Sequence, residues 1–162
     1  MSMRIGNGFD IHRFTDDPAR PLVLGGVVIQ SELALAGHSD ADVIAHAVAE
    51  SLLGAAGLDD IGTLFPDTDQ RWRDADSVEL LAECVMRVRA AGWRPVNVDC
   101  SVIAERPKLA PHKAAMQARL TEVVGAPVTI KGRRAEQIGG LGRAEGIACL
   151  ASALIESADG AP

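Results

Sequence analysis

The chain has 162 residues, a length that favours one domain with a core of its own, without disulfide staples. Hydrophobic residues make up 48% of it, which excludes disorder as the main state, and only 3% are aromatic, so Leu, Val, Ile and Ala must fill the core. A net charge of −6 and so few aromatic side chains argue against nucleic acid as a partner.

The three cysteines, Cys84, Cys100 and Cys149, lie far apart in apolar runs and form no CxxC pair. This spacing is typical of free, buried thiols in a reducing compartment, so we expect a cytoplasmic location. We expect no membrane partner either, because the sequence shows no signal peptide and no apolar stretch long enough to cross a bilayer.

Hydrophobic periodicity and turn residues predict the element order β, β, α, loop, α, β, α, β, β. In chain order, the predicted segments are a strand at Met3–His12, a bent strand or hairpin at Pro21–Gln30, a helix at Ala41–Ala56, a loop at Leu58–Asp74, a helix at Ala75–Ala91, a strand at Pro95–Glu105, a helix at Pro111–Val124, and strands at Val128–Lys131 and Gly146–Ile155.

This order predicts a single α/β domain over residues 1–162, an α+β sandwich whose mixed sheet carries helices on one face in a ferredoxin-like arrangement. Ser39 followed by Asp42 fits a variant of the capping box at the start of the first helix. Gly57, Gly92 and Gly125 are expected to end the three helices, and residues 157–162 to form a frayed tail.

Asp10 and His12 are two residues apart on a predicted strand, so their side chains share one face. With His46 from the first predicted helix, they form a set of one carboxylate and two imidazoles, which suits a zinc site with an open position. Taken alone, the Asp-His pair also fits a structural role, and so does a lone histidine on a helix.

Three further segments can bind an anionic ligand. Gly37–Asp42 stands at a helix entry, where free backbone N–H groups and His38 can meet a phosphate, although its Ser and Asp residues also fit plain helix capping. The acidic loop Asp59–Asp69 contains the constrained pair Phe65-Pro66, which suggests an ordered loop. The stretch Lys131–Gly146 places Arg and Lys beside glycines, a setting that suits an oxyanion as well as a charged turn.

Read together, these segments resemble the cyclodiphosphate synthase family over nearly the whole chain and in the same order. The segments that carry the resemblance are RIGNGFDIHRF, GHSDADVIAHAVAESLLGAAGLDDIG, LFPDTD, NVDCSVIAERPKLAPH and GLGRAEGIACLASALI.

The resemblance implies a homotrimeric enzyme of the non-mevalonate isoprenoid pathway, with active sites between neighbouring subunits. It implies cyclisation of 4-diphosphocytidyl-2-C-methyl-D-erythritol 2-phosphate to the 2,4-cyclodiphosphate, with release of CMP. Asp10, His12 and His46 match the ligands of a zinc-type ion. Glu136 matches a carboxylate that holds a second divalent ion, magnesium or manganese, together with the substrate phosphates.

The remaining site residues follow from the resemblance as well. His38 and Ser39 match residues at the phosphates, and Arg143 matches a residue toward the trimer axis, where some members bind an isoprenoid diphosphate. The longer stretches are Asp60, Ile61 and Gly62 at the methylerythritol; Phe65, Pro66, Asp67, Thr68 and Asp69 in the loop over it; and Ala104, Glu105, Arg106, Pro107, Lys108, Leu109 and Ala110 around the cytosine base.

The chain departs from the family pattern between Gly132 and Ala135. Arg134 stands where a phosphate-contacting threonine is common, so we assign Arg134 with His38 to catalysis, and Arg133 and Ala135 beside it to substrate binding. Gly140 stands where an aromatic residue commonly lines the trimer channel. Two other functions stay open: a zinc-dependent phosphoesterase that uses water as nucleophile, and a trimeric binding protein for isoprenoid diphosphates or metals without catalysis.

Overall fold

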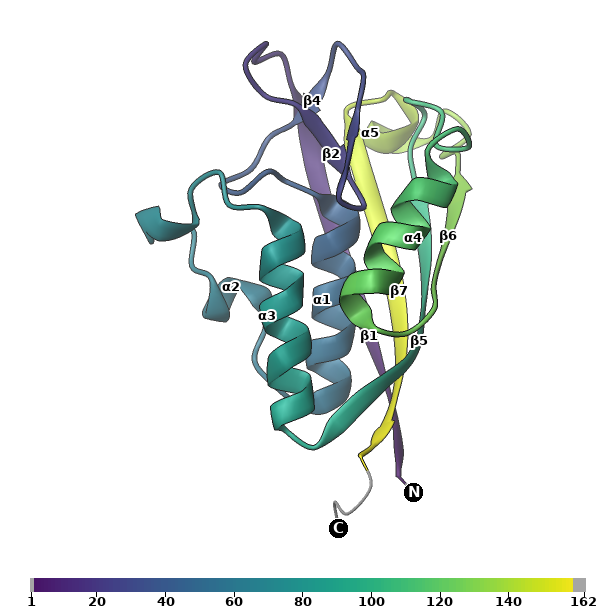
Figure 1. The fold of residues 1–162 in the computed structure, drawn as a ribbon. Helices are drawn as coiled ribbons and strands as arrows, with labels where there is room; N and C mark the ends of the chain where they lie inside the picture. Colours follow the sequence, from purple (N-terminus) through teal and green to yellow (C-terminus); the bar gives the residue numbers. More distant parts are fainter. Residues whose placement is uncertain (1, 159–162) are drawn as a thin grey trace.

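The computed structural model describes residues 2–158, which form a mixed sheet of five strands and a separate hairpin (Figure 1). The sheet has the order β4-β1-β7-β5-β6, in which only β5 and β6 run parallel. The strands are β1 (Met3–Thr15), β2 (Leu22–Leu24), β3 (Val27–Ile29), β4 (Ala34–Leu35), β5 (Trp93–Ile103), β6 (Val128–Arg133) and β7 (Gly146–Ser157).

Three longer helices pack against the sheet, with α1 and α3 side by side and α4 next to them (Figure 1). The helices are α1 (Val43–Ala56), α2 (Ile61–Leu64), the 3-10 helix η1 (Gln70–Trp72), α3 (Ser77–Ala90), α4 (Lys113–Val124) and α5 (Gly139–Gly142). Leu, Ile, Val and Ala side chains supply most of the core between them, as the composition predicts. The predicted mixed α/β fold is confirmed. No helix of the described part has the length and apolar character needed to span a membrane.

Helix α1 lies directly on the backbone of β1, because β1 carries glycine where the two elements meet. A Cβ atom at Gly6 would lie 2.1 Å from the Ser51 carbonyl oxygen, and one at Gly8 would lie 2.0 Å from that of Ala47. No side chain fits in so little space. The two glycines therefore set the distance between α1, which carries His46, and β1, which carries Asp10.

The helix C-termini that end at a glycine match the prediction. The N-terminus of α1 differs from it, because its capping residue also binds a distant segment. Gly57 and Gly125 end α1 and α4 in left-handed conformations with φ of 71° and 74°. The predicted cap at Ser39 is wrong, because the carboxylate of Asp42 accepts the Ile44 and Ala45 N–H groups at 3.1 Å. Asp42 also accepts hydrogen bonds from Gly25 and Gly26 in the β2–β3 turn, a contact that no local pattern reveals.

Several boundaries differ from those predicted. The stretch Leu58–Asp74 contains α2 and η1 and is therefore not purely a loop, and the two-residue strand β4 was not predicted. Strand β7 continues to Ser157, whose N–H donates to the Ser2 carbonyl, and the Ala158 N–H donates to the Gly92 carbonyl at 2.9 Å, so the prediction of a frayed tail is wrong for these two residues. Residues 159–162 of that tail lie outside the described residues.

Candidate functional site

Asp10, His12 and His46 converge on one point between β1 and α1. The Oδ2 atom of Asp10 lies 3.0 Å from His12 Nε2 and 2.9 Å from His46 Nδ1. One ligand atom from each residue lies within 4.8 Å of the others, and among residues 2–158 no other group of three such side chains meets this geometry. The structure thus brings together the three residues predicted as metal ligands.

The donor set fits a divalent metal ion. A tetrahedral ion with bonds of about 2.0 Å keeps its ligand atoms roughly 3.3 Å apart, so the Asp10 oxygen and each histidine nitrogen need to separate by only a few tenths of an ångström. Two imidazoles and one carboxylate leave the fourth position open, as in catalytic zinc sites.

His12 is held in one orientation by its second ring nitrogen. His12 Nδ1 lies 2.7 Å from the Ala36 carbonyl oxygen, an acceptor, so Nδ1 carries the proton and Nε2 faces the cluster. Burial alone would lower the pKa of His12, but the hydrogen bond and charge of Asp10 outweigh it and raise the pKa. Burial would raise the pKa of Asp10, yet the hydrogen bonds from His12 and His46 lower it well below its ordinary value.

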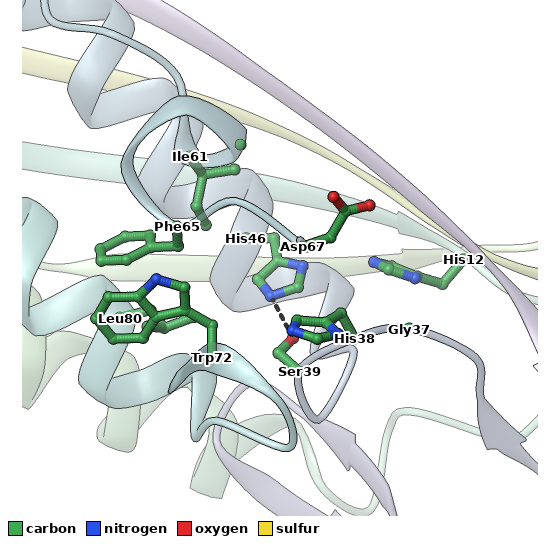
Figure 2. A pocket seen from close by; sticks show the side chains of 11 residues that line it. His12, Gly37, His38, Ser39, His46, Ile61, Phe65, Asp67, Trp72 and Leu80 are labelled. Atoms are coloured by element: carbon green, nitrogen blue, oxygen red, sulfur yellow. Dashed lines mark hydrogen bonds between the residues drawn. The ribbon is translucent and has the colours of Figure 1, made fainter. Parts of the chain in front are cut away.

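The cluster borders a cavity of about 320 Å³. Predicted substrate residues line it: His12, His38, Ser39, Ile61, Gly62, Phe65 and Asp67. Figure 2 shows the imidazoles of His12, His38 and His46 on one side of the cavity, and Phe65, Trp72 and Leu80 on another. The cavity therefore offers a polar side for an anion and an apolar side for a carbon skeleton. Trp72 and Leu80 were not predicted, because no motif singles them out, whereas Gly37 belongs to the segment Gly37–Asp42 that was expected to meet a phosphate.

The acidic loop beside this cavity is ordered by its own aspartates. Asp60 caps α2 by accepting the Thr63 N–H at 2.7 Å, and Asp69 caps η1 by accepting the Arg71 N–H at 3.0 Å. The Asp69 carbonyl oxygen lies 3.2 Å from His38 Nε2, which ties the loop to the other wall of the cavity. Pro66 and Thr68 belong to the same loop but do not line the cavity.

A second cavity of about 470 Å³ lies between the loop after β5 and the end of β6. It contains most of the residues expected around the cytosine base and its neighbours: Ala104, Glu105, Pro107, Lys108, Leu109, Ala110, Arg133 and Arg134. It shares no lining residue with the first cavity. Arg106 lines neither of these two, but a third hollow with Phe14 and Leu33.

Arg134 is bound to Glu105 in the second cavity. Its Nε and Nη2 atoms lie 3.0 and 2.9 Å from Glu105 Oε2, and they lower the pKa of that carboxyl group. The Glu105 side chain is 9% exposed and that of Arg134 is 68% exposed, so the arginine covers the acid. The assignment of Arg134 to catalysis stays a prediction.

The other predicted residues lie along the turn between β6 and β7. Glu136 has a φ of 50° and is exposed, and it does not belong to the metal cluster of the described residues. Arg143 pairs with Glu145 at 2.7 Å, and Gly140 lines a small hollow with Ile11 and Leu141. Ala135 precedes Glu136 and is half-buried. Their roles stay predictions.

Comparisons with known proteins show the family of this chain. The model of the YgbB family matches residues 3–156. A 2-C-methyl-D-erythritol 2,4-cyclodiphosphate synthase of Salinibacter ruber is 51% identical over 96% of this chain and 100% of its own length.

Two solved structures have the same fold. The bifunctional IspDF of Campylobacter jejuni is 41% identical with a TM-score of 0.91, over 96% of this chain and 42% of that longer one. The CDP complex of IspF from Plasmodium falciparum is 32% identical with a TM-score of 0.84, over 98% of both chains. The resemblance to the cyclodiphosphate synthases is confirmed, and this chain belongs to the YgbB family.

Proposed function

We propose that the cavity beside Asp10, His12 and His46 is the active site of a cyclodiphosphate synthase. The chain catalyses cyclisation of 4-diphosphocytidyl-2-C-methyl-D-erythritol 2-phosphate to 2-C-methyl-D-erythritol 2,4-cyclodiphosphate, and releases CMP, in the non-mevalonate isoprenoid pathway. The observation that carries this assignment is the metal-ligand cluster at the wall of a cavity with one polar and one apolar side.

In this reaction, an oxygen of the 2-phosphate attacks the β-phosphorus, and CMP leaves from the opposite side. Both reacting groups are anions, so the protein has to offset their repulsion and hold them in line. Asp10, His12 and His46 would hold a zinc-type ion, and Glu136 a magnesium or manganese ion shared with the substrate phosphates. When bound, such ions supply positive charge to the phosphate oxygens.

The remaining residues of the cavity bind and orient. His38 and Ser39 donate hydrogen bonds to phosphate oxygens, since both side chains face the same space as the cluster. The methylerythritol lies against Ile61 and Phe65, whose apolar surfaces suit its carbon skeleton, and the segment from Asp60 to Gly62 fixes its hydroxyl groups. The loop Phe65–Asp69 covers it.

The cytidine part binds in the second cavity, at Ala104–Ala110. A relative of this chain was solved as a CDP complex, which supports a cytidine diphosphate as ligand. Because the two cavities share no lining residue, we place the metal cluster of one copy beside the second cavity of a neighbouring copy. The homotrimer expected from the resemblance is part of this proposal, as are the ferredoxin-like arrangement expected from the element order and a cytoplasmic location.

The assembly is supported by the sheet face opposite α1. Ile5, Phe9 and Ile11 on β1 and Leu150 on β7 point to that face and are 74%, 55%, 52% and 49% exposed. Phe9 and Leu150 are direct cross-strand partners, and the polar pair Asn7 and Ser152 separates them from Ile5 on the same face. A patch of this kind is typical of an interface between protein chains.

The test is turnover of the authentic substrate in water enriched in ¹⁸O, with and without added zinc and magnesium. A cyclase forms the cyclic diphosphate and CMP without incorporating ¹⁸O, because the nucleophile is the substrate's own phosphate. A phosphoesterase would place ¹⁸O in its product and would also cleave plain CDP. Metal-dependent formation of the cyclic product excludes the binding-protein alternative, and its absence would overturn the proposed function.

A further inference from the structure

The ring nitrogen of His46 that faces away from the metal cluster has a partner outside the site described so far. His46 Nε2 lies 2.8 Å from the hydroxyl oxygen of Ser77, the first residue of α3. The Ser77 hydroxyl in turn donates to Asp40 Oδ1, and the Ser77 N–H donates to Asp40 Oδ2 at 3.1 Å. A chain of hydrogen bonds thus runs from Asp40 through Ser77 to His46.

The number of available protons determines which group donates in each of these hydrogen bonds. A serine hydroxyl has one proton, and the Asp40 carboxylate, which can only accept, takes it. The Ser77 oxygen must then accept the proton of His46 Nε2. A metal ion at Nδ1 would take the place of the proton that Nδ1 shares with Asp10 Oδ2 at 2.9 Å, so the neutral imidazole would keep its one proton on Nε2 and offer the Nδ1 lone pair to the metal.

From this geometry, and on the basis of the metal site in the proposed function, we propose that Ser77 and Asp40 are positioning residues that keep His46 Nδ1 ready to bind the metal ion. Ligating histidines commonly donate their other N–H to a carboxylate or carbonyl, which fixes the ring and raises its basicity. Here a buried serine, 1% exposed, relays that effect from the carboxylate.

Ser39 cannot do the same, although it lies nearby. Its hydroxyl oxygen is 3.2 Å from His46 Nε2 and accepts the Ala41 N–H, but no carboxylate takes its proton. The Ser39 hydroxyl also lies 3.4 Å from that of Ser77 and can donate to it, or to a substrate oxygen when one is bound. Asp40, by contrast, is fixed from both sides, since its N–H donates to the Ala75 carbonyl and its Oδ1 accepts the Asp42 N–H at 3.1 Å.

The first experiment measures zinc affinity by competition with a chelator, without substrate. We expect Ser77→Ala to weaken zinc binding about 10–100-fold, the usual effect of removing such a partner. Ser51→Ala is the matched control, because Ser51 is a buried serine of α1 whose hydroxyl bonds only within the helix, to the Val48 carbonyl at 2.8 Å. The control should bind zinc like the unchanged protein. Equal affinity of Ser77→Ala and Ser51→Ala would overturn the proposal.

The second measurement reads the proton itself. In the zinc-loaded protein, ¹H–¹⁵N NMR of the histidine side chains should show His46 protonated on Nε2, with slow exchange of that proton with water. Exchange should be faster in Ser77→Ala and in Asp40→Asn, which keeps the shape of the carboxylate but not its charge. A His46 protonated on Nδ1, or exchange unchanged in both variants, would contradict the relay. If the unchanged protein and His46→Ala bind zinc equally weakly, the metal site of the proposed function fails instead.

Discussion

His12 makes the metal site depend on pH. Because Asp10 raises the pKa of His12 above its ordinary value of 6.5, His12 keeps its proton to a higher pH than a free histidine does. An imidazole binds a metal ion only after that proton has left. We expect zinc affinity to fall about tenfold per pH unit below the raised pKa, which corresponds to one displaced proton.

The stability of the metal-free protein should change with pH in the opposite direction to the zinc affinity. Since folding raises the pKa of His12, its protonation stabilises the folded state fully below pH 6.5, and this contribution is lost as the pH rises through the raised pKa. Asp10 stays ionised throughout this range, because its pKa is lowered from 3.8. Chelator competition and thermal melts over the same pH series test both trends. His12→Gln should flatten the melting profile; a zinc affinity independent of pH would argue against His12 as a ligand.

Arg134 can act in two ways: it can neutralise Glu105, or it can contact the substrate phosphates directly. Arg134→Thr removes the cation and leaves the Glu105 carboxylate, 9% exposed, unpaired in the cavity proposed for cytidine diphosphate. We expect CDP to bind roughly tenfold more weakly, because an uncompensated negative charge then faces an anion. The double variant Glu105→Gln/Arg134→Thr should restore the affinity.

Calorimetry with CDP on the four proteins of this cycle measures the coupling between the two positions. Restored binding assigns Arg134 to neutralising Glu105. A double variant as weak as Arg134→Thr would instead show that the guanidinium contacts the phosphates directly.

At the scale of elements, the α1–β1 contact positions the metal ligands. A methyl group at Gly8 would lie 2.0 Å from the Ala47 carbonyl and 2.7 Å from the Ser51 nitrogen, both backbone atoms that cannot rotate away. We expect Gly8→Ala to lower the free energy of unfolding by about 1–3 kcal/mol, as overpacking does, and to weaken zinc binding as α1 moves from Asp10.

Gly54→Ala is the control on the same helix. Its new methyl group would meet only the Asn7 carbonyl, at an ordinary 3.8 Å, and alanine favours the helix by about 0.5–1 kcal/mol. Denaturant unfolding of both variants should therefore show shifts of opposite sign. A stable Gly8→Ala protein with full zinc affinity would mean that α1 tolerates a larger distance from β1.

Elements were predictable from sequence where the signal is local. Examples are the alternation of side chains along β1 and the glycines Gly57 and Gly125 that end helices. Each of these signals involves only residues close together in the sequence. At the N-terminus of α1 the sequence offered both Ser39 and the aspartates as caps. The choice of Asp42 was not predictable, since Asp42 also binds a hairpin turn far back in the chain.

The candidate site shows the same division. Asp10 and His12 lie on one strand face by simple spacing, and His46 on the first predicted helix completes a set of one carboxylate and two imidazoles. Ser77 carries no signal, because it approaches His46 from 31 residues further along the chain, through the packing of α3 beside α1. The cavity wall formed by Trp72 and Leu80 was missed for the same reason.

For the whole molecule, the open face of the sheet is where the proposed trimer can be tested. Leu150 is 49% exposed on β7 opposite Phe9, so Leu150→Glu places a charge in the apolar patch without touching the metal ligands. We expect this variant to dissociate at concentrations where the unchanged chain stays a trimer, because an interface that buries an unpaired charge loses several kcal/mol.

Light scattering gives the mass, and Met86→Glu is the control, since Met86 is 58% exposed on α3, away from this face. Turnover should fall together with the trimer mass in Leu150→Glu and stay unchanged in Met86→Glu, because the cavity for cytidine and the metal cluster then no longer meet across two copies. A fully active monomer would show that both cavities of a single chain act together in catalysis. It would contradict the proposal of an active site shared between two copies, but not the assignment of the metal ligands.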